Sequence, residues 1–189
     1  GEPMKPGLVA IFPVALALAA CGPSLADDVD LENVAPDDIS WIGESPIYPN
    51  ATIAENVAAS PAFSRLAMLV ERTDLAQTLG GEGPLTIFAP TDAALVNLPP
   101  HTDETLRKTL AHHAIAERIT AADLAARIVE GGGIYRAQTL AGDMLTFRMD
   151  RETVVLSGSD GSSARVTMAD LAQANGLMHV IDGIVLPAG

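Results

Sequence analysis

The chain is poor in several kinds of residue, and each shortage excludes a class of function. It has one cysteine, Cys21, so no internal disulfide can form. Aromatic residues make up only 4 %, which leaves few rings for base-stacking or sugar-stacking platforms. Lysine and arginine number 11 against 24 acidic residues, and the formal net charge is −13. Because phosphate binding needs clustered positive charge, we expect no nucleic-acid partner.

The apolar run near the N-terminus is too short to cross a bilayer. It covers the 13 residues 8–20 after Met4-Lys5, whereas a spanning helix needs about 20. The run ends in Leu18-Ala19-Ala20-Cys21-Gly22, which resembles the signal of a bacterial lipoprotein. That resemblance implies a signal peptide over residues 1–20 and acyl chains on Cys21, and Gly22 after the cysteine indicates the outer membrane. The alternative is an ordinary signal peptide with an incidental cysteine, and the origin of Gly1-Glu2-Pro3 stays open.

An acidic segment separates Cys21 from the rest of the chain. Between Cys21 and Asn50 there are seven acidic residues and no lysine or arginine, with several prolines. This composition predicts an extended, solvated tether over residues 21–45. Trp41-Ile42 is the exception: the pair either packs on the domain as its first ordered element or forms an exposed anchor for a partner.

The remainder changes from helical to strand periodicity along its length. Ser60-Pro61 and Thr120-Ala121-Ala122-Asp123 are typical helix starts, and the second helix is expected to run to Glu130. Further helices are expected over residues 92–98, from about 103, and over 169–174. Beyond Gly133 apolar residues alternate, and Asp160-Gly161 indicates a hairpin turn. Helices followed by strands predict an α+β fold.

Two segments combine a buried strand with a tight turn. The first is Leu85-Thr86-Ile87-Phe88-Ala89-Pro90-Thr91-Asp92, in which Thr91 or Asp92 can cap a helix. The second is Asn175-Gly176-Leu177-Met178-His179-Val180-Ile181-Asp182-Gly183-Ile184-Val185-Leu186-Pro187, which starts with a turn dipeptide. In this order and spacing they resemble the two signature blocks of the fasciclin domain.

The resemblance to fasciclin domains extends over most of the folded part. Residues 47–56 are similar to the family's entry segment, and Leu110-Ala111-His112-His113-Ala114-Ile115 to its central block. His113 matches the usual histidine there, while His112 stands where a tyrosine is usual. The resemblance implies one domain over residues 46–188, with a wedge of two small β-sheets and helices packed alongside. It also implies a binding module and no enzyme.

No constellation of residues in the sequence indicates catalysis, a metal or a cofactor. The adjacent His112 and His113 diverge by about 100° on a helix and cannot chelate one ion alone. His113 and His179 are interpreted as buried groups satisfied by backbone hydrogen bonds. The hydroxyl-rich residues 157–163 lack a nucleophile-elbow spacing and indicate a hairpin loop.

Surface recognition is the function that remains. In animal fasciclin domains an acidic-aliphatic motif before the second block is linked to integrin-type binding, and only Asp170 and Leu171 match it here. The alternative, which we favour, is that Asp170 starts the expected helix and Leu171 packs inward. With His112, these two residues are the candidate contacts. We expect a non-catalytic, lipid-anchored module of the bacterial envelope, periplasmic or surface-exposed, that acts in adhesion or protein association. Its partner is expected to be an extracellular or envelope protein or glycan. The alternative is a periplasmic sensor or carrier that binds a small ligand or metal near His112 and His113.

Overall fold

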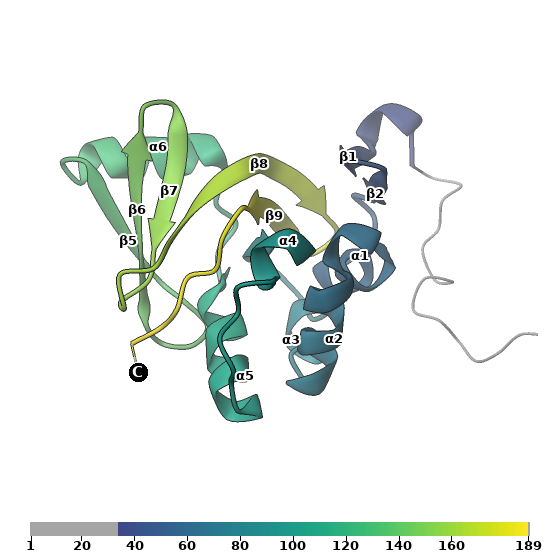
Figure 1. Ribbon diagram of the computed structural model, residues 1–189. Helices are drawn as coiled ribbons and strands as arrows, with labels where there is room; N and C mark the ends of the chain where they lie inside the picture. The colour runs from purple at the N-terminus through teal and green to yellow at the C-terminus, as the bar shows by residue number, and fades with distance from the viewer. Residues whose placement is uncertain (1–33, 189) are drawn as a thin grey trace, which may run out of the picture.

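Residues 34–188 form helices and strands that pack into the arrangement shown in Figure 1. The structure is a computed structural model, and these are the residues that it describes. The expected signal peptide, Cys21 and the first part of the tether lie outside the described residues. None of the described helices is long and apolar enough to cross a membrane.

Six α-helices of the described part come in two groups. The first group is α1 (Ile53–Ala59), α2 (Ser64–Arg72) and α3 (Ala76–Leu79), with a 3-10 turn at Pro61–Phe63. The second is α4 (Asp92–Leu95), α5 (Asp103–His112) and α6 (Ala121–Glu130). The start of α6 is confirmed in detail, because Thr120 and Asp123 make the reciprocal hydrogen bonds of a capping box.

One ladder of seven strands runs through the described residues in the order β4-β3-β9-β8-β7-β6-β5. At its centre β3 (Leu85–Pro90) and β9 (Gly176–Ile181) pair in parallel, and every residue of both strands is buried. The short β4 (Ala114–Ile115) pairs with β3. The remaining strands form an antiparallel meander: β5 (Ile134–Gln138), β6 (Met144–Asp150), β7 (Thr153–Ser157) and β8 (Ser163–Gln173).

The long strand β8 divides this ladder into two halves. Its first part pairs with β7 and its second part with β9, with register shifts around Met168. Such bulges bend and twist a strand, and Figure 1 shows β8 as a curved arrow that joins the meander to the β3–β9 half. The expected α+β architecture of two small sheets with helices packed alongside is therefore confirmed, with β8 shared by the two sheets.

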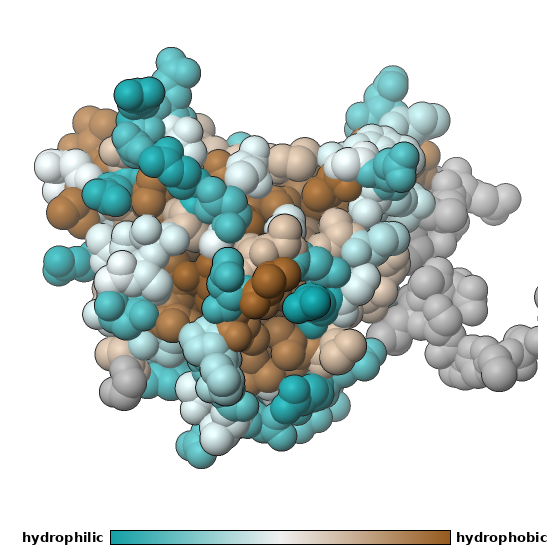
Figure 2. Space-filling view, in the orientation of Figure 1, coloured by the Kyte–Doolittle hydropathy of each residue, from teal (hydrophilic) through white to brown (hydrophobic). Residues whose placement is uncertain are grey.

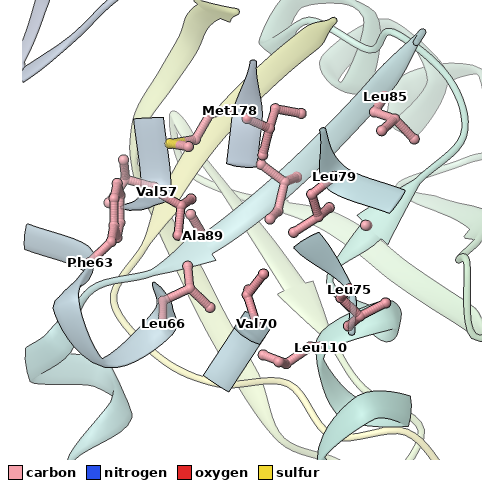
Figure 3. Close-up of a cluster of buried hydrophobic side chains, with 14 of the residues drawn as sticks. Val57, Phe63, Leu66, Val70, Leu75, Leu79, Leu85, Ala89, Leu110 and Met178 are labelled. Atoms are coloured by element: carbon pink, nitrogen blue, oxygen red, sulfur yellow. The ribbon is translucent and has the colours of Figure 1, made fainter. Parts of the chain in front are cut away.

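Two hydrophobic clusters fill the two halves. The first, drawn in Figure 3, lies between the helices α1 to α5 and the paired strands β3 and β9. It includes Phe63, Leu66 and Met178. The second lies between α6 and the meander and includes Phe88 and Phe147, whose ring centres are 5.2 Å apart. Because neighbouring residues of a strand point to opposite faces, β3 supplies Ile87 and Ala89 to the first cluster and Phe88 to the second.

The last part of the expected tether is ordered. A hairpin of β1 (Ser40–Ile42) and β2 (Ser45–Ile47) precedes α1, and Gly43 takes a φ of +62° at its turn. The sequence did not predict this hairpin, because the acidic residues and prolines of the segment are typical of an extended tether. Trp41 and Ile42 differ: Ile42 packs against the first cluster, whereas Trp41 is 52 % exposed.

The expected helix over residues 169–174 is wrong. Residues 169–173 belong to β8, with Leu171 opposite Met178 of β9. Local sequence favours a helix here, but strand pairing buries Leu171, which is 4 % exposed. Asp170 takes a φ of +61° where the register shifts, a conformation that aspartate tolerates better than most residues.

Candidate functional site

Asn175 and Gly176 join three parts of the fold at the start of β9. The Asn175 Oδ1 atom accepts a hydrogen bond of 3.0 Å from the Ile53 N–H, which begins α1. Its Nδ2 atom donates to the carbonyls of Leu79 and Gly81, both at 2.8 Å. A Cβ atom on Gly176 would lie 1.8 Å from the Leu85 carbonyl oxygen, so only glycine fits. The turn dipeptide therefore fastens β9 to β3 and to the helices.

His113 lies just beyond α5 and connects this helix to the segment after β9. Its Nδ1–H donates to the Thr109 carbonyl at 2.8 Å, and its Nε2 atom accepts from the Val185 N–H at 3.2 Å. Burial lowers its pKa to about 4, although the hydrogen bond to Thr109 acts in the opposite direction. The imidazole is therefore neutral near pH 7, and both nitrogens bond to backbone, as expected.

His179 on β9 has the same kind of structural role. Its Nε2–H donates to the Ile119 carbonyl at 2.9 Å, its Nδ1 atom accepts from the Asp170 N–H at 3.2 Å, and its ring stacks on Phe88. Burial lowers its pKa, and the hydrogen bond to Ile119 opposes this. Both expected buried histidines are thus satisfied by backbone groups.

Asp170 and Leu171, two of the candidate contacts, are engaged within the fold. The Asp170 Oδ1 atom accepts a 2.8 Å hydrogen bond from the N–H of Ala121, the first residue of α6. This bond caps α6 from a neighbouring strand. Leu171 belongs to the first hydrophobic cluster. The Asp170 carboxylate is exposed, but Leu171 presents no surface to a partner.

The capping expected at the end of the first block takes another form. Thr91 occupies the N-cap position of α4, but its side chain makes no capping hydrogen bond. Asp92 instead accepts a 2.8 Å hydrogen bond from the Arg65 N–H and so caps α2. Asp182 accepts a 2.8 Å hydrogen bond from the Arg165 N–H and holds the end of β9 to β8.

His112, the third candidate contact, is fully buried. Its Nδ1 atom lies 3.9 Å from the Asp143 Oδ2 atom, and neither ring nitrogen nor that oxygen has a hydrogen-bond partner within residues 34–188. Burial lowers its pKa, and the Asp143 carboxylate partly opposes this. Its ring stands edge-on to that of His113 at 6.5 Å. The described residues contain no group of three metal-ligating side chains.

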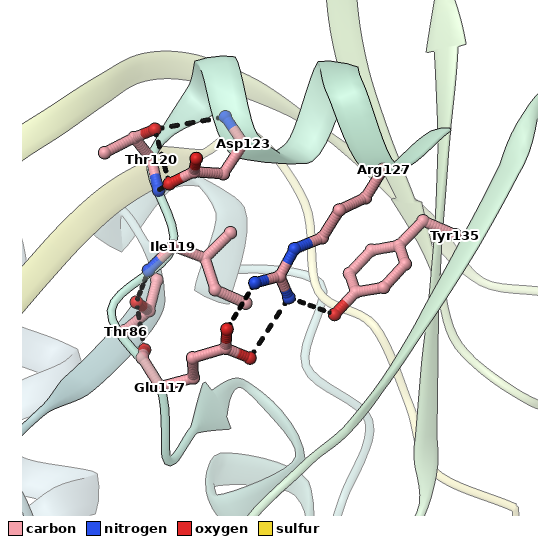
Figure 4. A network of polar contacts seen from close by, with 7 residues as sticks. All are labelled: Thr86, Glu117, Ile119, Thr120, Asp123, Arg127 and Tyr135. Carbon is pink, nitrogen blue, oxygen red and sulfur yellow. Dashed lines mark hydrogen bonds and ion pairs between the residues drawn. The ribbon is translucent and has the colours of Figure 1, made fainter. Parts of the chain in front are cut away.

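A network of hydrogen bonds and an ion pair lies beside α6 (Figure 4). No pattern in the sequence predicted it. The Arg127 guanidinium donates to the Glu117 carboxylate and, at 2.7 Å, to the Tyr135 hydroxyl. The hydrogen bonds from Arg127 hold the pKa of Glu117 below its usual value. Thr86 Oγ1 donates to the Glu117 carbonyl at 2.6 Å and accepts from the Ile119 N–H at 3.0 Å. The network fixes the direction in which the chain enters α6.

One face of the molecule exposes apolar side chains from α2 and α4. Met68 is 60 % exposed and Val96 63 % exposed. Met68, Leu69, Leu95 and Leu98 line a hollow of about 320 Å³, and Val96 directly follows Leu95 at the end of α4. We call these five residues the α2–α4 patch. Figure 2 shows apolar residues at the surface in this region. Larger apolar patches that are rimmed by polar residues are typical of interaction sites.

A second hollow of about 720 Å³ lies beside α5. The hairpin loop at Asp160, the turn at Leu140 and the chain at Leu186 form its other walls. Lys108 of α5 lines it and donates to the Ala188 carbonyl at 2.8 Å. Its volume falls in the range of small-molecule sites.

Comparison with known proteins agrees with the fold. Residues 61–187 match the sequence model of a protein family, the fasciclin domain. The chain is 36 % identical over 145 residues to protein sll1483 of Synechocystis, a match that covers 72 % of this chain and 73 % of that protein. It is 28 % identical over 151 residues to human stabilin-1, covering 76 % of this chain but 6 % of stabilin-1.

A solved structure shows the same fold. A pair of fasciclin-type domains from the insect cell adhesion molecule fasciclin I superimposes with a TM-score of 0.62 at 19 % identity, covering 78 % of this chain and 57 % of that one. Fasciclin domains thus occur in adhesion-related binding proteins. From the match of its sequence and of its fold, we conclude that the chain belongs to the fasciclin domain family.

Proposed function

We propose that the protein is a lipid-anchored binding module of the bacterial envelope that acts without catalysis in adhesion or protein association. The anchor is Cys21, and the acidic segment after it holds the domain away from the membrane, where it meets an envelope or extracellular protein. Two or three acyl chains on one residue are enough for stable anchoring. Many copies on one surface then add avidity to a weak single contact.

The observation that carries this proposal is the contrast between the interior and the surface. His112, His113 and His179, the side chains best suited to chemistry, are buried, and the last two are occupied by backbone hydrogen bonds. The surface instead presents the α2–α4 patch, whose exposed Met68 and Val96 have no role in the two hydrophobic clusters. Exposed apolar area of this kind supplies binding energy when a partner covers it.

The test compares the adhesion of cells that display variants of the full chain. Cells are held on surfaces coated with envelope or extracellular-matrix protein, and retention under flow is measured. We expect Met68→Glu with Val96→Glu to abolish retention, and Cys21→Ser to abolish display. Val129→Glu with Met144→Glu is the matched control, since both residues are exposed and apolar but lie outside the patch. Equal loss in both double variants would contradict the proposal.

A second candidate function is favoured by the buried side-chain atoms of His112 and Asp143 that have no hydrogen-bond partner within the described residues. Lys108, four residues before His112 on α5, lines the hollow beside this helix, and its Nζ atom lies 3.8 Å from the Asp143 Oδ2 atom. A carrier of a small ligand would use this place. Calorimetric titration of zinc or copper and of a small-metabolite panel tests it: stoichiometric binding that His112→Ala removes supports a carrier, and its absence leaves adhesion alone.

A further inference from the structure

The meander of β5 to β8 has one face that no helix of residues 34–188 covers. Helix α6 packs against β5, β6 and β7, and the alternate residues Leu145, Phe147 and Leu156 meet it in the second cluster. In Figure 1 α6 lies behind these strands, and their opposite face is turned toward the viewer. The side chains between the core residues therefore point to this outer face, on which Arg136, Arg148 and Arg165 are exposed.

The register of the strands places three arginines on the outer face. Residues directly opposite one another in antiparallel strands share a face. Arg148 is opposite both Ile134 and Val155, and Val155 is opposite Arg165. Val155 lies between the two arginines in the register; it is 3 % exposed and belongs to neither hydrophobic cluster. Arg148, Val155 and Arg165 thus form one row across the sheet.

The next row of the same face is polar throughout. It contains, in order across the strands, Arg136, Thr146, Ser157 and Ser163. Arg136 and Arg148 are diagonal neighbours on adjacent strands, a separation of about 7–8 Å. We call the two rows together the arginine face.

The charges of this face are largely uncompensated. Arg165 pairs with Asp150 at 2.5 Å, but Arg136 and Arg148 form no ion pair or hydrogen bond with any residue of the described range 34–188. Two neighbouring positive charges repel each other. No acidic residue of the described part of the chain forms an ion pair with either of these two arginines. A bound anion would relieve the repulsion.

We infer that the arginine face binds an acidic polysaccharide whose sugars carry carboxylates. Each guanidinium presents paired N–H donors that fit a carboxylate, and the hydroxyls of Thr146, Ser157 and Ser163 match the hydroxyl groups of a sugar. This row of hydroxyls favours a glycan over a bilayer. The outer rows contain no aromatic ring, so affinity depends on charge, and a neutral glycan is not bound.

This inference rests on the proposed function, since it names a partner for a binding module. The test is isothermal titration of the full chain with oligogalacturonate, with dextran as the neutral glycan and phosphatidylglycerol vesicles as the alternative anion. We expect binding to oligogalacturonate alone, weakened at least about tenfold by Arg136→Gln with Arg148→Gln, because hydrogen bonds between charged groups are lost. Added salt should weaken binding by the wild type more than by the variant.

The matched control is Arg65→Gln with Arg107→Gln, which removes two exposed arginines elsewhere and changes the net charge equally. Equal weakening by both double variants would show that net charge alone decides binding, and would overturn the inference. So would a preference for dextran or for vesicles, or no binding at all. Cell retention through the α2–α4 patch is measured separately. Retention without glycan binding would therefore remove this inference and leave the proposed function intact.

Discussion

The burial of His113 makes the stability of the domain depend on pH in a predictable direction. The folded state lowers the pKa of His113 from 6.5 to about 4. Between pH 4 and pH 6.5 the His113 imidazole is mostly protonated in the unfolded chain and mostly neutral in the folded protein. The unfolded state thus binds more protons, so stability is highest above pH 6.5 and falls as the pH is lowered. From pH 7 to pH 4 the loss from this group amounts to about 3 kcal/mol.

Urea unfolding of the wild type and His113→Asn at a series of pH values isolates this contribution. The carboxylates and the other histidines titrate in both proteins, so their effects cancel in the difference. We expect the wild type to be more stable at pH 7 because its imidazole makes two backbone hydrogen bonds. That advantage should shrink by about 3 kcal/mol by pH 4.

A parallel pair of stability curves would refute the reasoning, since it would mean that His113 has the same pKa in both states. The chemical shifts of the His113 ring protons give an independent check. We expect them to report a neutral imidazole down to about pH 4 in the folded protein. His101→Asn, which changes a histidine that is partly exposed whereas His113 is buried, controls for the loss of an imidazole as such.

Three further predictions concern the structural roles of the motif residues, and thermal or urea unfolding of five variants tests them. Gly176→Ala should cost at least about 3 kcal/mol, because its Cβ would collide with the Leu85 carbonyl and separate β9 from β3; a cost below 1 kcal/mol would contradict that contact. Asp170→Ala should cost at least about 1 kcal/mol, through the lost cap of α6 and because alanine tolerates the φ of +61° poorly; Asp170→Asn should cost less, since asparagine keeps an acceptor and tolerates that φ, and equal costs would contradict both reasons. His112→Leu should be nearly neutral because it removes unpartnered polar atoms, whereas His113→Leu should destabilise by about 2 kcal/mol or more; the reverse order would disprove this assignment.

The parts of the fold with strong local signals could be predicted from the sequence. The central strands β3 and β9 are continuous apolar runs because they are buried on both faces. The capping box at Thr120 is local as well, since both of its partners lie within one helical turn. In contrast, residues 169–173 have helical propensity and become a strand only because Met178 lies opposite Leu171.

The candidate site was harder to predict, because its roles depend on partners far along the chain. Nothing local distinguishes His112, which is buried without a hydrogen bond, from His113, whose Nε2 atom bonds to Val185. Asp170 was expected to begin a helix and instead caps one that starts 49 residues earlier. The arginine face becomes visible only when the register sets Arg136 beside Arg148. Single residues could thus be selected from the sequence, but not their partners.

Retention of cells that display the full chain is the most direct test of a binding module of the envelope. Displaying cells and cells without the protein are compared on the same protein-coated surface under the same flow. Our account predicts retention that needs the chain, that Met68→Glu with Val96→Glu abolishes, and that Val129→Glu with Met144→Glu preserves. Equal retention with and without the chain would contradict the account.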